Sequence, residues 1–391
     1  MKTKLAEIVV IGGGVIGTSI AYYLAKKGID ITLVDKDDIA SGTSSACGGF
    51  IMLQTKEPGL KLKMALESAE IFQSLGEELD YDIEYKKDGG MVVIETEEEF
   101  ESMLSLVKRQ REFKLEVELL DKDQMIKRQP YLSHQLLAST YSPIDAQVHP
   151  IKLTLGFAQA AQRCGAKLYS FTQVKSIRVS NDQITGVVTS EGEIKTKIIV
   201  NAAGIRAPEI GRMVGLEIPI KPRRGQIVIT EQVPPLLKEA LTSAAYLAAK
   251  GTKKSTKITD QDIKKLGAGL IVEQTKDGNL ALGSTREFIG YNKKTSYEGI
   301  STILRCATKA IPILREVHAI RSFAGLRPTT PDGLPIIGRA PGLKGFIIAT
   351  GHEGDGIALA PITGKLVTDL IIKEESPAQL DHLNLERFLH R

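Results

Sequence analysis

The first strand and turn of the sequence constrain the fold more than any other stretch. Ile8 to Ile11 form an apolar run that is typical of a buried strand. This run leads into a G-x-G-x-x-G pattern with glycines at 12, 14 and 17, and the helical pattern that follows ends at Gly28. In a β-α-β unit such glycines permit a tight turn, close approach of the backbone to a pyrophosphate, and close packing of the helix on the strand. The sequence therefore predicts a dinucleotide phosphate at the N-terminus of this helix.

An acidic residue at the expected distance supports this interpretation. A second apolar strand, Ile31 to Val34, ends at Asp35, which lies 23 residues after Gly12. An acid at that distance can accept hydrogen bonds from an adenosine ribose. We expect the ligand to lie along the residues that open the helix and follow the second strand, namely Gly12, Gly14, Val15, Ile16, Gly17, Asp35 and Lys36. The alternative is a glycine-rich turn without a ligand, and the spacing favours the dinucleotide.

Composition excludes several functional classes. The 391 residues predict two domains, and a net charge of +4, from 51 basic and 47 acidic residues, is too balanced to indicate a nucleic-acid or membrane-surface partner. No run of 18 apolar residues predicts a membrane span, and the absence of a signal-peptide pattern predicts a cytoplasmic protein. The three cysteines, at 47, 164 and 306, are too scattered for a metal or cluster site, and the histidines show no ligand spacing, so no metal is expected.

Changes in the sequence pattern indicate two interleaved domains. We expect an α/β, Rossmann-like dinucleotide-binding domain and an α+β domain built on an antiparallel sheet. The first takes residues 1–80, 145–218 and 321–391, and the second takes 81–144 and 219–320. The patterns also predict a helix over 56–75 and strands over 83–85 and 194–200. The Lys-, Ala- and Thr-rich segment 236–262 fits no element, and a mobile flap is one interpretation of it.

Two further turns of small residues are predicted to converge with the first glycine turn on one extended ligand. They are 201–204, at the end of a buried strand, and 351–356, which precedes a helix in which Pro361 is expected to lie in the first turn. The small-residue loop 40–49 is also predicted to contact a ligand, with a flexible connector as the alternative. Such loops let the backbone approach a flat ligand or phosphates closely. Cys47 lies in the loop 40–49, where a small packing residue is favoured over a redox-reactive or flavin-anchoring thiol.

These motifs together resemble the D-amino-acid oxidase superfamily of FAD-dependent amine oxidoreductases. The resemblance covers nearly the whole chain and is strongest to the glycine oxidase and sarcosine oxidase β-subunit group. Subunits of multi-component dehydrogenases, such as those of D-hydroxyproline dehydrogenase and opine oxidase, are the most similar subgroup. The resemblance implies non-covalent FAD. Beyond the residues above, it implies cofactor contacts at Gly42, Thr43, Ser44, Ser45, Gly48, Gly49, Val174, Ala203, Gly204, Gly325, Arg327, Gly351, His352, Gly354, Asp355, Gly356 and Ile357.

The resemblance also implies a substrate site. Arg327 matches an arginine that binds the substrate carboxylate, with a structural salt bridge as its alternative role. His352 and Asp355 are the other candidate catalytic residues, although a structural histidine is favoured over a base. Amides of 354 to 357 are expected to stabilise negative charge on the reduced flavin. Two family positions differ: Gly354 stands where glycine oxidase has a second arginine, and Leu270 where it has a substrate-binding tyrosine. A larger imino acid or opine is therefore favoured over glycine.

The predicted activity is oxidation of the C–N bond of a small amino or imino acid, of the proline, hydroxyproline, opine or sarcosine class, to an imine. The subgroup resemblance implies a partner subunit that carries further redox centres and accepts the electrons. One alternative is an oxidase that uses O₂ and releases hydrogen peroxide. The other is a non-oxidative FAD protein, such as an RNA-modifying flavoprotein, which the balanced charge argues against.

Overall fold

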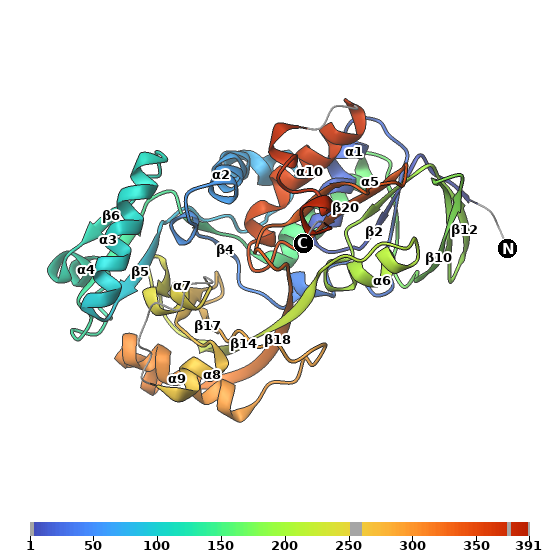
Figure 1. Cartoon of the computed structure of the whole chain (residues 1–391). Coiled ribbons are helices and arrows are strands. Elements are labelled where there is room, and N and C mark those ends of the chain that lie inside the picture. The colour runs from blue at the N-terminus through green and yellow to red at the C-terminus, as the bar shows by residue number, and fades with distance from the viewer. Residues whose placement is uncertain (1–3, 251–259, 374–376, 390–391) are drawn as a thin grey trace.

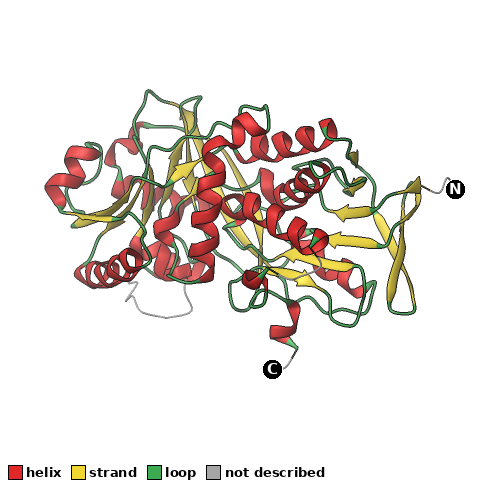
Figure 2. Ribbon diagram, turned by 90° about the horizontal axis from the view of Figure 1, so that it is seen from above, coloured by secondary structure: helices red, strands yellow, loops and turns green. Residues whose placement is uncertain are grey.

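The computed structural model describes residues 4–250, 260–373 and 377–389, and two large sheets dominate it (Figures 1 and 2). The six-stranded sheet has the order β19-β20-β13-β2-β3-β9. Its strands are β2 (Ile8–Ile11), β3 (Ile31–Val34), β9 (Lys167–Tyr169), β13 (Ile198–Asn201), β19 (Ile336–Arg339) and β20 (Phe346–Thr350). All its neighbouring strands are parallel except β19 and β20. The nearly continuous apolar sequences of β2 and β13 reflect burial on both faces of this sheet.

Helices cover one face of the six-stranded sheet and a smaller sheet covers the other. The helices are α1 (Val15–Ala25), α2 (Leu60–Glu78), α5 (Pro150–Arg163) and α10 (Gly356–Ile372), of which α1 packs against both α5 and α10. The short helix α6 (Ala207–Arg212) packs on the opposite face, where Ile210 joins the core of the smaller sheet. The four-stranded sheet has the order β1-β12-β11-β10. It consists of β1 (Lys4–Leu5), β10 (Val174–Ser180), β11 (Gln183–Thr189) and β12 (Gly192–Lys195). Its apolar side chains share one core with Val9 and Ile11 of β2.

The eight-stranded sheet has the order β18-β14-β17-β16-β15-β5-β7-β6 and is antiparallel except for the pair β15–β5. Its strands are β5 (Gly90–Ile94), β6 (Glu118–Leu120), β7 (Ala138–Ser142), β14 (Lys221–Gln232), β15 (Ala240–Ser243), β16 (Ile271–Gln274), β17 (Asn279–Gly283) and β18 (Ala319–Thr329). Around it lie α3 (Glu97–Glu112), α4 (Lys122–Arg128), α7 (Ala244–Lys250), α8 (Gln261–Leu266) and α9 (Tyr297–Ala310). A two-stranded sheet of β4 (Phe50–Ile51) and β8 (Ala146–Gln147) completes the strands.

Alternation along the central strands of the eight-stranded sheet gives it two different faces. Val272, Leu280 and Leu282 pack in one core with Ile303 and Ala307 of α9. The residues between them on the same strands point to the opposite face, because side chains of a strand alternate between its two sides. That opposite face forms a wall of the cavity described below.

Several sequence predictions differ from the structure. Residues 83–85 are irregular, with Glu84 at φ 53°, and form no strand. The predicted strand 194–200 is two strands, β12 and β13, which belong to different sheets. The helix predicted over 56–75 is α2, which begins only at Leu60 because Gly59 precedes it at φ 144°. Pro361 lies inside α10, beyond the first turn.

The strands of each proposed domain belong mostly to different sheets. Strands from 1–80, 145–218 and 330–391 build the six-, four- and two-stranded sheets, and strands from 81–144 and 219–329 build the eight-stranded sheet. The proposed crossing at residue 321 lies within β18, which pairs with β14 from Ala319 to Thr329. The segment 236–262 contributes β15, α7 and the start of α8, and its residues 251–259 lie outside the described part of the chain.

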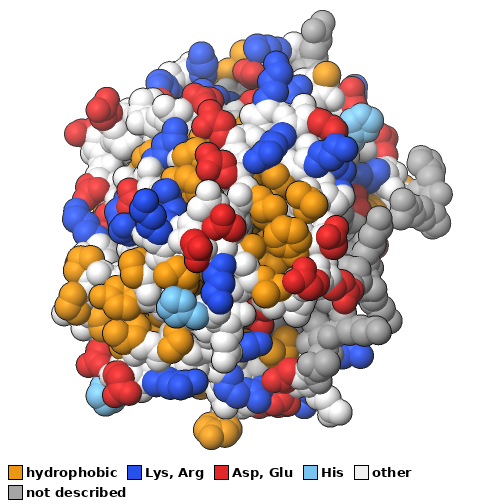
Figure 3. Space-filling model, turned by 90° about the vertical axis from the view of Figure 1, so that its left-hand side faces the viewer, with side chains coloured by type: hydrophobic (Ala, Val, Ile, Leu, Met, Phe, Trp, Pro, Cys, Tyr) orange, Lys and Arg blue, Asp and Glu red, His pale blue; other side chains and the backbone are white. Residues whose placement is uncertain are grey.

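The surface facing the viewer in Figure 3 shows lysine and arginine interspersed with aspartate and glutamate. In the described part of the chain no helix is both long enough and apolar enough to cross a membrane.

Candidate active site

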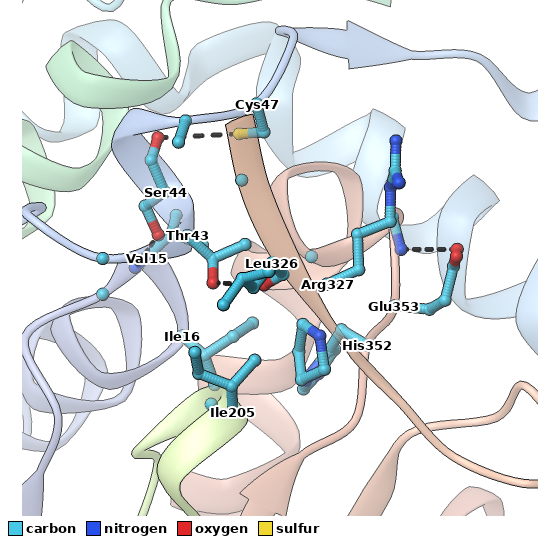
Figure 4. A pocket seen from close by; sticks show the side chains of 18 of the residues that line it. Val15, Ile16, Thr43, Ser44, Cys47, Ile205, Leu326, Arg327, His352 and Glu353 are labelled. Carbon is cyan, nitrogen blue, oxygen red and sulfur yellow. Dashed lines mark hydrogen bonds between the residues drawn. The ribbon is translucent and has the colours of Figure 1, made fainter. Parts of the chain in front are cut away.

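A large cavity lies between the six-stranded sheet and the eight-stranded sheet. Its volume is about 390 Å³. Figure 4 shows Val15, Thr43 and Ser44 on one side of it and Arg327, His352 and Glu353 on another. Segments that are hundreds of residues apart in the chain thus line one space, as the small-residue turns predict.

Glycines shape the end of the cavity next to α1. A Cβ at Gly12, which has φ 118°, would lie 2.4 Å from the carbonyl oxygen of Ala202. A Cβ at Gly17 would lie 1.9 Å from the carbonyl oxygen of Gly12. Only glycine at these two positions lets α1 approach β2 and β13 so closely. The first turn of α1 therefore opens onto the cavity, where its amides and the helix dipole favour an anion.

Asp35 and Ser44 fix this turn. The carboxylate of Asp35 accepts hydrogen bonds from the amides of Gly13, at 2.6 Å, and Asp37, at 2.8 Å. The hydroxyl of Ser44 accepts one from the amide of Val15 at 3.0 Å. Asp35 therefore has a structural role in addition to lining the cavity.

The loop that contains Ser44 also contacts β18. The hydroxyl of Thr43 donates to the carbonyl oxygen of Leu326 at 2.7 Å, and a Cβ at Gly325 would lie 2.1 Å from the carbonyl oxygen of Ala46. The thiol of Cys47 donates to the carbonyl oxygen of Ser44, and desolvation raises the pKa of Cys47 to about 12. A neutral, half-buried thiol agrees with the packing interpretation of this residue.

The turn before α10 holds its polar side chains in internal contacts. His352 is buried, its Nε2 lies 3.1 Å from the hydroxyl of Thr363, and burial lowers its pKa to about 3. Asp355 forms ion pairs with Lys56, at 3.3 Å, and Lys61, at 3.2 Å. His352 is therefore neutral at physiological pH, and Asp355 is held by two cations. These contacts give both residues a structural role beside the cavity.

Arg327 points into the cavity without a carboxylate partner. Its guanidinium donates to the carbonyl oxygen of Thr285 at 3.0 Å and to the hydroxyl of Ser284 at 2.8 Å, and it lies 3.4 Å from the hydroxyl of Tyr246. Among the side chains that the structure describes, no carboxylate forms an ion pair with it. The guanidinium lies over Gly225, where a Cβ would come within 2.4 Å of it. This arrangement suits a ligand carboxylate better than a structural salt bridge.

The structure leaves four of the predicted cofactor residues off the cavity wall: Gly17, Ser45, Gly49 and Gly351. Gly17 contacts Gly12, the hydroxyl of Ser45 donates to the carbonyl oxygen of Gly42, and a Cβ at Gly351 would meet Thr330. The amide of Gly49 donates to Glu273. The other predicted residues line the cavity, including Lys36, Gly42, Gly48, Val174, Ala203, Gly204, Gly354, Gly356 and Ile357.

Sequence reasoning missed several charged residues and one tyrosine of the site. Arg286 pairs with Glu353 at 2.8 Å, Arg223 approaches Glu353 at 3.8 Å, and the guanidinium of Arg286 lies 4.3 Å from the ring centre of Tyr246. Lys56, Lys61, Glu273 and Tyr246 were also not predicted. Tyr246 belongs to the segment 236–262, whose pattern fits no element. Its phenol lies beside Arg327. The chain thus has a phenol near Arg327 although Leu270 stands at the family's tyrosine position.

Comparison with known proteins agrees with this geometry. A family model described as FAD dependent oxidoreductase matches residues 7–370. The chain belongs to this family of FAD-dependent oxidoreductases. Glycine oxidase of Geobacillus kaustophilus is 30% identical over 99% of this chain and 98% of that protein. Hydrogen cyanide synthase subunit HcnC of Pseudomonas aeruginosa is 28% identical, over 98% of this chain and 96% of that protein.

Solved structures show the same likeness. The crystal structure of L-proline dehydrogenase from P. horikoshii superimposes with a TM-score of 0.88 at 30% identity and covers 99% of both chains. The crystal structure of glycine oxidase from Geobacillus kaustophilus gives a TM-score of 0.88 at 28% identity over 98% of both chains.

The residues of the cavity fit the FAD that defines the family. A dinucleotide needs an anion site and a close backbone approach, which the first turn of α1 and the glycines at 12 and 14 provide. The N-terminus of α10, where Asp355 makes no side-chain capping hydrogen bond, also opens onto the cavity. Two helix N-termini thus face one cavity. The protein is an FAD-dependent oxidoreductase, and these two helices and the loop that contains Ser44 would hold its FAD.

Proposed function

We propose that this FAD-dependent oxidoreductase oxidises the C–N bond of a small amino or imino acid to an imine. The observation that carries the proposal is the guanidinium of Arg327, which points into the cavity with neutral partners only among the described side chains. A permanently charged guanidinium binds a carboxylate through two parallel hydrogen bonds. The likeness to L-proline dehydrogenase and to glycine oxidase supports a substrate that carries such a carboxylate.

Within this class we favour substrates larger than glycine, such as proline, hydroxyproline, sarcosine or an opine. Gly354 leaves space beside Arg327, because a Cβ there would meet only the Arg327 side chain, at 3.5 Å. The sheet that lines the cavity carries only small residues next to the same guanidinium, namely Gly225, Ala281 and Gly283. They leave space for a ligand there. A secondary amine or a substituted α-carbon fits this space.

The protein supplies orientation and exclusion of water. FAD, when bound, would supply the acceptor for a hydride from the substrate α-carbon. Arg327, with Ser284 and Tyr246 beside it, fixes the carboxylate and thereby the direction of the C–H bond. The sheet wall and the loop that contains Ser44 enclose the reacting atoms. His352, which is neutral, and Asp355, which is held by two lysines, stabilise the turn before α10 and do not act as bases.

We further propose that FAD is bound non-covalently and that electrons pass to a partner subunit. Cys47 and Cys306 have raised pKa values, to about 12 and about 11, so neither thiol is poised to react with the cofactor. The likeness to a hydrogen cyanide synthase subunit supports a multi-subunit enzyme. The likeness to glycine oxidase supports the second candidate, an oxidase that reduces O₂ to hydrogen peroxide.

One experiment tests substrate class and acceptor together. The visible spectrum of the FAD-loaded protein is followed without oxygen while glycine, sarcosine, L-proline, D-proline, D-hydroxyproline or an opine is added. We expect one of them to bleach the flavin. Readmission of air then separates an oxidase, which recovers its colour rapidly, from a dehydrogenase, which recovers slowly. A flavin that none of these compounds bleaches would contradict the proposed function.

A further inference from the structure

Glu273 is a buried acid on the cavity wall. It is 8% exposed, and both of its carboxylate oxygens lie 3.0 Å from one donor, the amide of Gly49. An ionised carboxylate offers about four acceptor sites, so one amide leaves most of its capacity unused. Among the described side chains, none forms an ion pair with it. Burying an acid without an ion-pair partner lowers the stability of the folded protein. Such an acid is a candidate for ligand binding when it faces a cavity.

The sheet register places Glu273 near Arg327. Glu273 pairs with Ala281, and Ile271 pairs with Gly283, so Glu273 and Gly283 are diagonal neighbours about 7–8 Å apart on one face. Gly283 directly precedes Ser284, whose hydroxyl accepts from Arg327. Small residues, Ala281 and Gly283, lie between the acid and Ser284 on this face of the sheet. The carboxylate of Glu273 and the guanidinium of Arg327 thus line the same cavity.

Two pairs of charged side chains around the cavity neutralise each other: Arg286 binds Glu353, and Lys56 binds Asp355. The thiol of Cys47 interacts electrostatically with Glu273, and its raised pKa keeps it neutral. Tyr246 of α7 lines the same cavity. Desolvation raises the pKa of Glu273 to about 7, so it can both bind and release a proton near neutral pH.

We infer that Glu273 binds the nitrogen of the substrate and takes one proton from it before the oxidation. This inference rests on the proposed function and deepens it. An amino acid arrives as an ammonium, which has no lone pair to form the C=N bond. One N–H bond breaks, an O–H bond forms on Glu273, and the electron pair of the broken bond stays on nitrogen. That pair forms the C=N bond as the α-C–H bond breaks and its two electrons pass, with the hydrogen, to FAD. The substrates are therefore amino acids whose positively charged α-nitrogen bears a proton that Glu273 can remove.

The test uses whichever compound of the panel bleaches the wild-type flavin. Anaerobic bleaching rates and apparent Kd values are measured from pH 6 to 10 for wild type, Glu273→Gln and Glu99→Gln. Glu99 is a matched control, because it is also a buried acid that accepts a backbone hydrogen bond but lies outside the cavity. FAD content and the melting temperature show whether each variant is folded and loaded. Binding of the same compound without its nitrogen, such as cyclopentanecarboxylate for proline, is followed by the perturbation of the flavin spectrum.

We expect Glu273→Gln to lower the bleaching rate divided by Kd about 30-fold or more at pH 7, a loss that shrinks toward pH 10, where the free amine predominates. Its affinity for the nitrogen-free acid should stay within about threefold of wild type, and Glu99→Gln should match wild type throughout. Three results would overturn the inference: unchanged rates, an equal loss at every pH, or an equal loss of affinity for the nitrogen-free acid. If no compound bleaches the wild type, the proposed function itself fails, and the inference fails with it.

Discussion

At the residue scale, Arg327 carries the assignment of a carboxylate-bearing substrate. Arg327→Leu removes the guanidinium while the fold around Gly225 and Ser284 remains, because both contact it only at its polar end. We expect substrate affinity to fall by about 2–5 kcal/mol, the usual cost of removing one member of a buried, hydrogen-bonded charge pair.

The measurement is the anaerobic Kd for substrate, with FAD content as the control. Arg327→Lys should recover part of the affinity, because it keeps the charge but loses the planar pair of donors. An unchanged Kd in Arg327→Leu would show that the carboxylate binds elsewhere.

We expect the Glu273 carboxylate, which has a role in the site, to lower the free energy of unfolding. Burial raises its pKa to about 7, so ionisation is unfavourable in the folded protein and its cost grows as pH rises from the ordinary glutamate value toward 7. The difference corresponds to roughly 3 kcal/mol of unfolding free energy above pH 8.

In the protein without substrate, Glu273→Gln should therefore be more stable than wild type at pH 8 and equally stable near pH 4. Chemical denaturation at the two pH values measures this. A variant that is less stable at pH 8 would show that the carboxylate is compensated by contacts other than the amide of Gly49.

Some site residues could be predicted from sequence and others could not. Arg327 was predicted because it lies in a Pro- and Gly-punctuated segment that matches a family motif. The ion pairs of Asp355 with Lys56 and Lys61 join residues almost 300 positions apart. No local pattern specifies such pairs, because they depend on how α2 and α10 pack.

At the scale of elements, the turn from β2 to α1 leaves no space for added side-chain atoms at Gly17. Gly17→Ala would place a Cβ 1.9 Å from the carbonyl oxygen of Gly12, in a core where neither backbone can move freely. We expect loss of FAD binding together with a loss of about 3 kcal/mol or more of unfolding free energy, as is usual for severe overpacking.

Gly28→Ala is the matched control, because its Cβ would meet no atom within 4 Å and only its φ of 81° causes strain. That variant should lose about 1 kcal/mol and keep its FAD. Visible absorbance and thermal unfolding distinguish the two variants, and equal behaviour would contradict the close-packing explanation.

The prediction of helices and strands failed where tertiary packing determines their bounds. Residues 194–200 were predicted as one buried strand, but the chain changes sheets between β12 and β13, within the polar residues 195–197. Pro361 was expected in the first turn of α10 yet lies further inside the helix. There the hydroxyl of Ser19 in α1 donates to the carbonyl oxygen of Ala360, so packing on α1 supports this stretch of the helix.

At the scale of the whole molecule, the cavity connects both large sheets, so FAD should stabilise the chain as one unit. A ligand at 100 times its Kd stabilises the folded state by about 2.7 kcal/mol. Removing FAD should lower the melting temperature by several degrees, and adding it back should restore the original value. A single transition that FAD does not shift would argue against a site lined by both sheets.

The six-stranded sheet was predictable because the turns at 12–17, 201–204 and 351–356 each follow a buried strand, and such turns gather at the carboxyl ends of parallel strands. The eight-stranded sheet was only partly predictable. Its strand β15 and the cavity residue Tyr246 lie in a segment whose composition gives no clear periodicity.

The measurement that tests the account most directly is a stoichiometric anaerobic titration of the FAD-loaded protein with the amino or imino acid that bleaches it. Flavin absorbance and the carbonyl compound formed by hydrolysis of the imine are quantified in the same sample. We predict one product molecule for each flavin bleached. Bleaching without that product, or no bleaching by any carboxylate-bearing amine, would contradict the proposal that this cavity oxidises a C–N bond.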